Sequence, residues 1–149
     1  MPVTGDTIVT LVDGSRSSVC HLQPGMTLSN GFNIVTIAVR RFTGWLYIIE
    51  PHFITTGTTL IGNDKQLAKH IATKRVYATA DVYDFAFDEQ HRPVYTYETH
   101  PLFWSSMLSD DAVNEIIYLP DETEHDPDSK VYHRIWDAEG KVWRHELVV

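Results

Sequence analysis

Hydrophobic and polar residues alternate in short segments along most of the first hundred positions, and this period of two predicts β-strands. Asp13-Gly14 and Asn30-Gly31 separate such segments, and both dipeptides are typical of hairpin turns. Gly44 precedes an aromatic strand that Pro51 closes, because proline cannot donate a hydrogen bond to a neighbouring strand. The predicted strands are residues 7–12, 18–22, 26–28, 32–39, 45–49, 74–79, 80–87 and 94–97.

Two segments have helical periodicity instead. The first, residues 63–73, places four apolar side chains on one face. The second begins at Ser109, a good N-cap residue with acidic residues after it, and ends at Pro120. The inward-facing residues are Leu67, Ala68, Ile71 and Ala72 in the first helix and Ala112, Val113, Ile116 and Ile117 in the second.

The chain changes character after residue 104. An acidic loop at 120–130 follows the second helix, and strands at 131–136 and 141–148 then flank a turn that ends in Gly140. We therefore predict a mainly β domain over residues 1–104. We predict that residues 105–149 form an extension, made of a helix, an acidic loop and a hairpin, that packs on this domain.

Composition limits the classes of partner. The 149 residues are 43% hydrophobic, which is enough apolar material for a core. The net charge of −8 argues against a nucleic-acid partner, since phosphate binding needs a basic surface. No apolar run approaches the ~20 residues of a membrane span. Residues 1–6 lack the features of a secretory signal, so we expect a soluble, cytoplasmic protein with no membrane partner.

Cys20 is the only cysteine. An internal disulfide and a cysteine-rich zinc site are therefore excluded. We expect Cys20 to lie on the strand at 18–22, well away from the chain start, as a small buried residue.

Three blocks, in order, carry a family resemblance. They are Val3-Thr4-Gly5-Asp6-Thr7 with the later Leu22-Gln23-Pro24-Gly25, then Ile49-Glu50-Pro51-His52, then Val82-Tyr83-Asp84 with the downstream His91. Over residues 2–104 the chain resembles the Hint superfamily, the hedgehog and intein self-processing fold. The resemblance implies a horseshoe of bent hairpins with one or two short helices and with neighbouring ends. His100-Pro101-Leu102-Phe103 is similar to the end of the Hint variant found in von Willebrand type A domain proteins.

The resemblance implies a chemistry as well. In the family a thiol at the first position attacks the preceding carbonyl, and histidine and aspartate groups in the later blocks move protons. The positions implied here are Pro2 (for the nucleophile), His52, Asp84, His91 and His100. Proline has no nucleophilic side chain, Ile49 stands at the threonine of the Thr-x-x-His block, and the chain has no His-Asn pair. With only Met1 upstream, we expect no cleavable segment and no self-cleavage.

Each of these residues also has a structural interpretation. Pro2 is either a replacement of a catalytic cysteine or the usual small residue after an initiator Met. His52 is either a proton donor or a structural residue at a strand end beside Pro51. Asp84 and His91 are either an acid and base pair or a turn aspartate and an exposed histidine.

No metal or other cofactor is predicted. His91, His100, His125 and His133 match no ligand spacing, and the acidic loop lacks the glycine and terminal glutamate of an EF-hand. No Gly-x-Ser-x-Gly elbow and no glycine-rich phosphate loop is present. The aromatic residues Trp104, Tyr132, Trp136 and Trp143, with His133, either pack on the β core, which we favour, or form a binding surface.

Two functions remain open. The first is a Hint-like autoprocessing domain, for protein self-cleavage or splicing, that is inactive because Pro2 replaces the nucleophile. Whether such a chain counts as an enzyme is undecided. The second is a non-enzymatic, β-rich protein-interaction module, viral or encoded by a mobile element. Both imply a protein partner, either the flanking segments or another chain.

Overall fold

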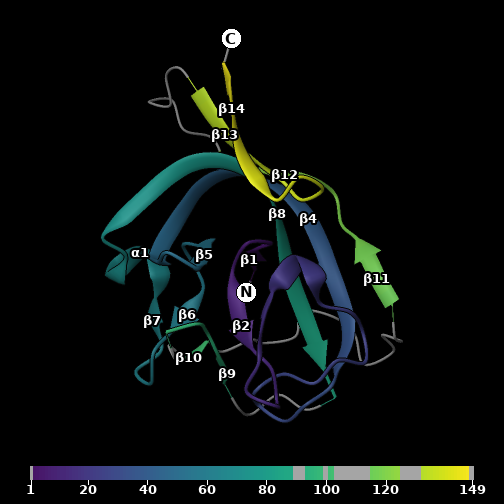
Figure 1. Ribbon diagram of the computed structural model, residues 1–149. Helices are drawn as coiled ribbons and strands as arrows, with labels where there is room; N and C mark the ends of the chain where they lie inside the picture. The colour runs from purple at the N-terminus through teal and green to yellow at the C-terminus, as the bar shows by residue number, and fades with distance from the viewer. Residues whose placement is uncertain (1, 89–92, 99–100, 103–114, 125–131, 148–149) are drawn as a thin grey trace.

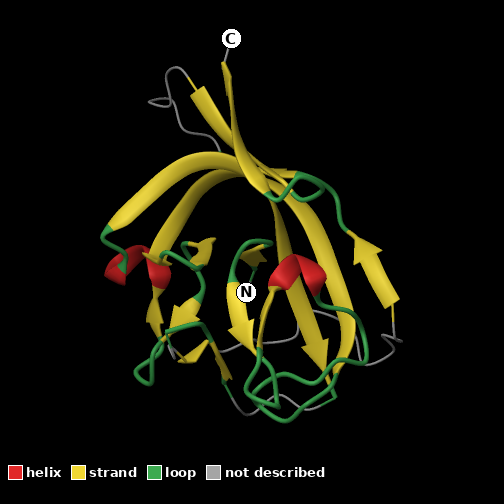
Figure 2. Ribbon diagram, in the orientation of Figure 1, coloured by secondary structure: helices red, strands yellow, loops and turns green. Residues whose placement is uncertain are grey.

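A computed structural model of the chain describes residues 2–88, 93–98, 101–102, 115–124 and 132–147. Within them the protein is mainly β, as predicted (Figure 2). The helical elements are η1 (Val19–His21) and α1 (Ala68–Ile71). The strands are β1 (Val3–Thr4), β2 (Ile8–Thr10), β3 (Arg16–Ser18), β4 (Ile34–Glu50), β5 (Phe53–Thr56), β6 (Leu60–Ile61), β7 (Gln66–Leu67), β8 (Lys74–Phe87), β9 (Val94–Tyr95), β10 (Pro101–Leu102), β11 (Glu115–Tyr118), β12 (Glu122–Thr123), β13 (Tyr132–Asp137) and β14 (Val142–Leu147).

A long antiparallel ribbon of β4 and β8 dominates the fold. The two strands pair from Ile34 opposite Phe87 to Ile48 opposite Lys74, and they arch over the N-terminal strands, with the C-terminal hairpin on the outer side of the arch (Figure 1). Each had been predicted as two shorter strands, and that division is wrong. Gly44 does not interrupt β4, because it pairs opposite Ala78 within the ribbon. A Cβ at Gly44 would lie 2.6 Å from the Phe42 ring, so the glycine allows a close approach.

The first strand lies at the centre of this sheet. Val3 of β1 pairs with Thr55 of β5 on one side and with Tyr83 of β8 on the other. Because β4 pairs with both β5 and β8, the strand pairings close into a ring, β4–β5–β1–β8–β4. The N-terminal segment therefore lies beneath the arch of the ribbon (Figure 1).

The predicted hairpin at Asp13-Gly14 is present, but its second strand is shorter than expected. β2 and β3 pair with Ile8 opposite Ser18, and Gly14 has a φ of 85°, a conformation that glycine adopts without strain. The chain then turns through η1, so Cys20 lies on a 3₁₀ turn and the prediction of a strand there is wrong.

One of the two predicted helices is confirmed in a short form. α1 begins at Ala68, because Leu67 and Gln66 pair with β6. The second is wrong over residues 115–118, which form β11 in parallel pairing with β4, while its beginning at 109–114 lies outside the described residues. Pairing with an open sheet edge satisfies the backbone of β11 and overrides its helical periodicity.

The C-terminal hairpin is present with the predicted turn. β13 and β14 pair with Asp137 opposite Val142, and β13 also joins β8 in parallel through Ile135 and Thr79. Strands from both sides of residue 104 thus belong to one sheet. In the described part of the chain, no helix is long and apolar enough to cross a membrane.

The buried residues that the structure describes form two hydrophobic clusters. The larger lies beneath the arch and the smaller lies between the ribbon and the C-terminal hairpin. The larger contains Val3, Val9, Val19, Leu22, Leu28, Ile34, Ile37, Phe53, Ile61, Ala68, Phe85, Phe87 and Val94. The smaller contains Phe42, Leu46, Ile54, Ala78, Ala80, Val82 and Trp136.

Candidate functional site

Pro2 lies in a row of residues that crosses four strands. Val3 pairs with Thr55 and Tyr83, and extending this antiparallel register by one residue places Pro2 between Thr56 and Asp84. Asp84 in turn pairs with Ala38 of β4. Residues opposite one another in a sheet share a face, so Thr56, Pro2, Asp84 and Ala38 lie side by side.

This row forms part of the lining of a cavity of about 630 Å³, a volume within the usual range for ligand and peptide sites. Two further groups of residues complete its walls. One group comes from β4, β8 and the segment 119–124. The other comes from Tyr47 near the end of β4, from the turn after β5 and from α1. The remaining lining residues are Arg40, Phe42, Val82, Leu119, Glu122 and Glu124 in the first group and Tyr47, Gly57, Thr58 and Lys69 in the second.

Buried threonine hydroxyls hold the first strand in place. The Thr55 hydroxyl donates to the Pro2 carbonyl oxygen at 2.7 Å and lies 2.6 Å from the Thr59 hydroxyl. The Thr7 hydroxyl donates to the Ile54 carbonyl and accepts from the Ile54 amide, each at 3.1 Å. These bonds fix the residues just before β1 and just after it against β5.

Replacing Thr55 with valine should therefore destabilise the fold without changing its shape. Valine has the same branching, but it leaves the Pro2 carbonyl and the Thr59 hydroxyl without this buried partner. We expect the free energy of unfolding in urea to fall by about 1–2 kcal/mol. Thr58→Val, at an exposed position in the turn after β5, is the matched control and should change it by less than about 0.5 kcal/mol. Equal effects of the two substitutions would contradict the assignment.

The cavity contains unpartnered hydrogen-bond donors. Among the described residues, three buried side-chain polar atoms lack a partner, and two of them, Arg40 Nε and Thr56 Oγ1, belong to residues that line this cavity. The other end of the Arg40 guanidinium pairs with Glu122 at 2.6 Å. Buried polar atoms are almost always satisfied in native proteins, so two exceptions on residues that line one cavity are an unusual feature of this region.

The structure brings together only part of the predicted site. Pro2 and Asp84 line the same cavity, and the Asp84 carboxylate accepts the Phe85 amide at 2.9 Å. His52 is exposed in the turn between β4 and β5, where its ring lies 4.9 Å from that of Tyr97, and it does not line the cavity. His91 and His100 lie outside the described residues, so their roles stay predictions.

Thr55 is a site residue that the sequence analysis missed. Its hydrogen bond to the Pro2 carbonyl joins residues 53 positions apart in the chain, so no local pattern in the sequence reveals it.

Cys20 is closer to the N-terminal segment than expected. Its amide donates to the Gly5 carbonyl at 3.0 Å, so the expectation that it lies well away from the chain start is wrong. Burial raises the pKa of the Cys20 thiol, which lowers the thiolate fraction at neutral pH. Burial also raises the pKa of the neighbouring Tyr83 hydroxyl to about 12.

The aromatic residues of the C-terminal hairpin pack inward where they are described. Trp136 belongs to the smaller core cluster and its ring lies 5.5 Å from that of Trp143. Trp104 lies outside the described residues. Within the described part of the chain, no group of three or more His, Cys, Asp or Glu side chains could hold a metal ion.

Comparison with known proteins adds no assignment. No family model matches the chain, and no curated protein matches it.

Proposed function

We propose that the chain is a Hint-type module that binds its own N-terminal peptide in a central cavity and has lost self-cleavage because Pro2 occupies the nucleophile position. The observation that carries the proposal is that the Thr55 hydroxyl holds the Pro2 carbonyl, which fixes Pro2 at a cavity that Asp84 also lines. A freely frayed N-terminus would have favoured the interaction-module alternative instead.

Acyl transfer at residue 2 needs a nucleophile and a group that moves a proton. A thiol at residue 2 would attack the carbonyl carbon of residue 1, forming a carbon–sulfur bond as the carbon–nitrogen bond breaks and the released amine takes a proton. Asp84 lines the cavity beside Pro2 and offers a carboxylate for proton transfer. Pro2 cannot take the first step, since its side chain carries no nucleophile.

Restoring the thiol tests the proposal. Pro2→Cys, with a peptide tag before residue 1, should lose the tag when dithiothreitol is added, because the added thiol cleaves the thioester. Pro2→Ala and the unchanged chain, tagged in the same way, should keep it. Intact mass over time measures the reaction. In the Pro2→Cys background, Asp84→Asn should slow the loss about a hundredfold.

One result would overturn the proposal. A Pro2→Cys protein that has the circular dichroism spectrum of the unchanged chain, but keeps its full mass in dithiothreitol, is not a disabled self-cleaving module. The β-rich interaction module would then be the better hypothesis, and a protein partner the next object of search.

A further inference from the structure

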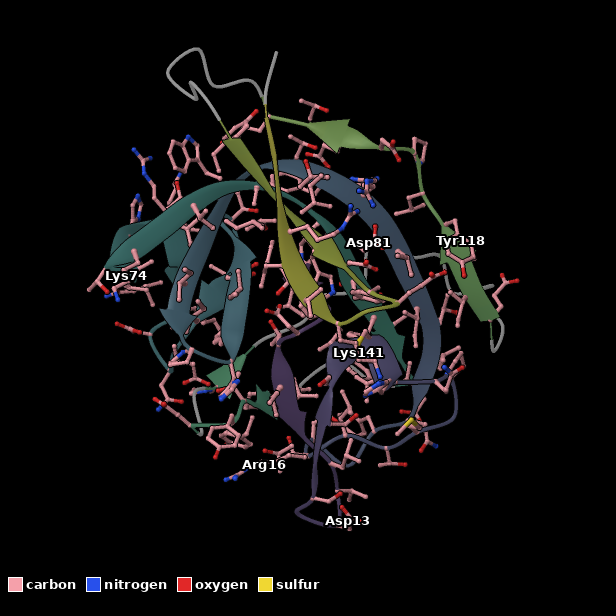
Figure 3. All side chains as sticks on the ribbon, turned by 45° about the horizontal axis from the view of Figure 1, so that its top comes forward. Asp13, Arg16, Lys74, Asp81, Tyr118 and Lys141 are labelled. Atoms are coloured by element: carbon pink, nitrogen blue, oxygen red, sulfur yellow. The ribbon has the colours of Figure 1, made fainter. Side chains whose placement is uncertain are left out.

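The C-terminal hairpin reaches across the sheet to the N-terminal turn. The indole Nε1 of Trp143, on β14, donates to a carboxylate oxygen of Asp6 at 3.0 Å, although the two residues are 137 positions apart in the chain. The Lys141 ammonium contacts the His21 ring beside the same turn, and Figure 3 shows Lys141 lying over the N-terminal part of the chain. The hairpin thus adds a direct polar contact to residues just after β1.

Asp6 connects this contact to the strand that holds Pro2. Its second carboxylate oxygen accepts the Thr4 hydroxyl, while the Thr7 amide closes the turn by donating to the Thr4 carbonyl at 3.1 Å. The Thr4 oxygen also lies 3.3 Å from the Ile54 carbonyl of β5. One carboxylate therefore joins the hairpin to the hydroxyl network that fixes β1.

The hairpin also packs on the turn without leaving a gap. A Cβ at Gly5 would lie 2.8 Å from Nε1 of Trp136 and 3.0 Å from Cβ of Cys20. Trp136 is only 5% exposed, so it has no room to move outward. Glycine at position 5 is thus what allows the hairpin to cover the turn.

We propose that the C-terminal hairpin, which lies outside the segment resembling the Hint family, positions the N-terminal strand, and that Trp143 is the positioning residue, acting through Asp6. Asp6 lies four residues from Pro2, and β1 is only two residues long, so a displaced turn moves Pro2 relative to Asp84. The expected effect on cleavage rests on the proposed function. The effect on the position of the turn does not, and it can be measured separately.

Amide hydrogen exchange tests the positioning in the unchanged sequence background. Trp143→Phe removes the indole donor while keeping an aromatic ring, and it should speed exchange at the amides of Thr7 and Cys20 about tenfold, since both hydrogen bonds belong to the turn. Trp45→Phe is the matched control. Trp45 contacts Arg75 and Tyr77 on the ribbon, and its replacement should leave exchange at the turn unchanged.

Substitution of the acceptor tests the same contact from its other side and supports a double-mutant cycle. Asp6→Ala should speed exchange at Thr7 and Cys20 as Trp143→Phe does, and the two changes together should add little to either alone. Asp6→Asn keeps an acceptor for the indole and should restore most of the protection. Fully additive effects, or unchanged exchange in the folded Trp143→Phe protein, would overturn the proposal.

The cleavage assay separates this inference from the proposed function. In the Pro2→Cys background, Trp143→Phe should slow the dithiothreitol-dependent loss of the tag about tenfold if the turn positions residue 2. If Pro2→Cys itself does not cleave, the proposed function fails, and the exchange measurements still decide the role of the hairpin. If it cleaves at the same rate with and without Trp143→Phe, the positioning role fails and the proposed function stands.

Discussion

Replacing Phe85 with alanine is expected to lower the free energy of unfolding by about 3–5 kcal/mol, the largest effect of any single substitution considered for this chain. Phe85 lies on β8, is 1% exposed and pairs opposite Ile37 of β4 in the larger core cluster. The ring of Phe87 lies 6.4 Å away and cannot fill the space left behind, since strand pairing fixes both residues. Urea unfolding measures the loss, and the thermal midpoint should fall by about 10 °C.

Two controls define the meaning of that result. Phe85→Leu keeps most of the apolar volume and should lower the free energy of unfolding by only about 1 kcal/mol. Tyr118→Ala, at a residue that is 80% exposed, should change it by less than about 0.5 kcal/mol. A loss below about 1 kcal/mol for Phe85→Ala would mean that the space beneath the arch is not filled as described.

Gly44→Ala should also destabilise the protein strongly, by about 2–3 kcal/mol, although it adds a single methyl group. The new Cβ would lie 2.6 Å from the Phe42 ring and 2.7 Å from Cβ of Glu124, and both neighbours are held in place. Phe42 is buried in the smaller cluster, and the Glu124 amide donates to the Thr43 carbonyl at 2.7 Å. Relief of the contact therefore requires the segment 119–124 to separate from β4, and urea unfolding measures the loss.

Gly140→Ala is the matched control for Gly44→Ala. The nearest atom to a Cβ at Gly140 is a carboxylate oxygen of Asp137 at 3.4 Å, an ordinary contact. We expect a change within about 0.5 kcal/mol, so similar losses for the two glycines would refute the packing described around Gly44.

The sequence predicts the mainly β character of the chain because the signals for strands and turns are local. Alternation of side chains and turn dipeptides such as Asp13-Gly14 depend only on neighbouring residues. The continuity of β4 through Gly44 depends instead on pairing with Ala78 of β8, 34 positions later, and so leaves no local signal. The strand at Ile116 and Ile117 likewise forms through pairing with β4, which their helical spacing does not reveal.

Part of the candidate site was also predictable from the sequence. Asp84 came from a short block resembling a family motif, and it lines the cavity with Pro2. The resemblance predicts a site role for His52, whereas the residue that contacts the Pro2 carbonyl is Thr55. The contact between Trp143 and Asp6 joins opposite ends of the chain, and no spacing within one sequence encodes such a contact.

The central place of β1 imposes an order on biosynthesis. Residues 3 and 4 are synthesised well before their partner strand β8, which ends at Phe87, and before β14, which carries the Trp143 contact and ends at Leu147. At translation rates of about 5–20 residues per second, the N-terminal strand waits roughly 4–17 s for β8 and longer for the hairpin. During that interval β1 lacks its partner β8, so the β-rich segments of the nascent chain are open to mispairing with other chains.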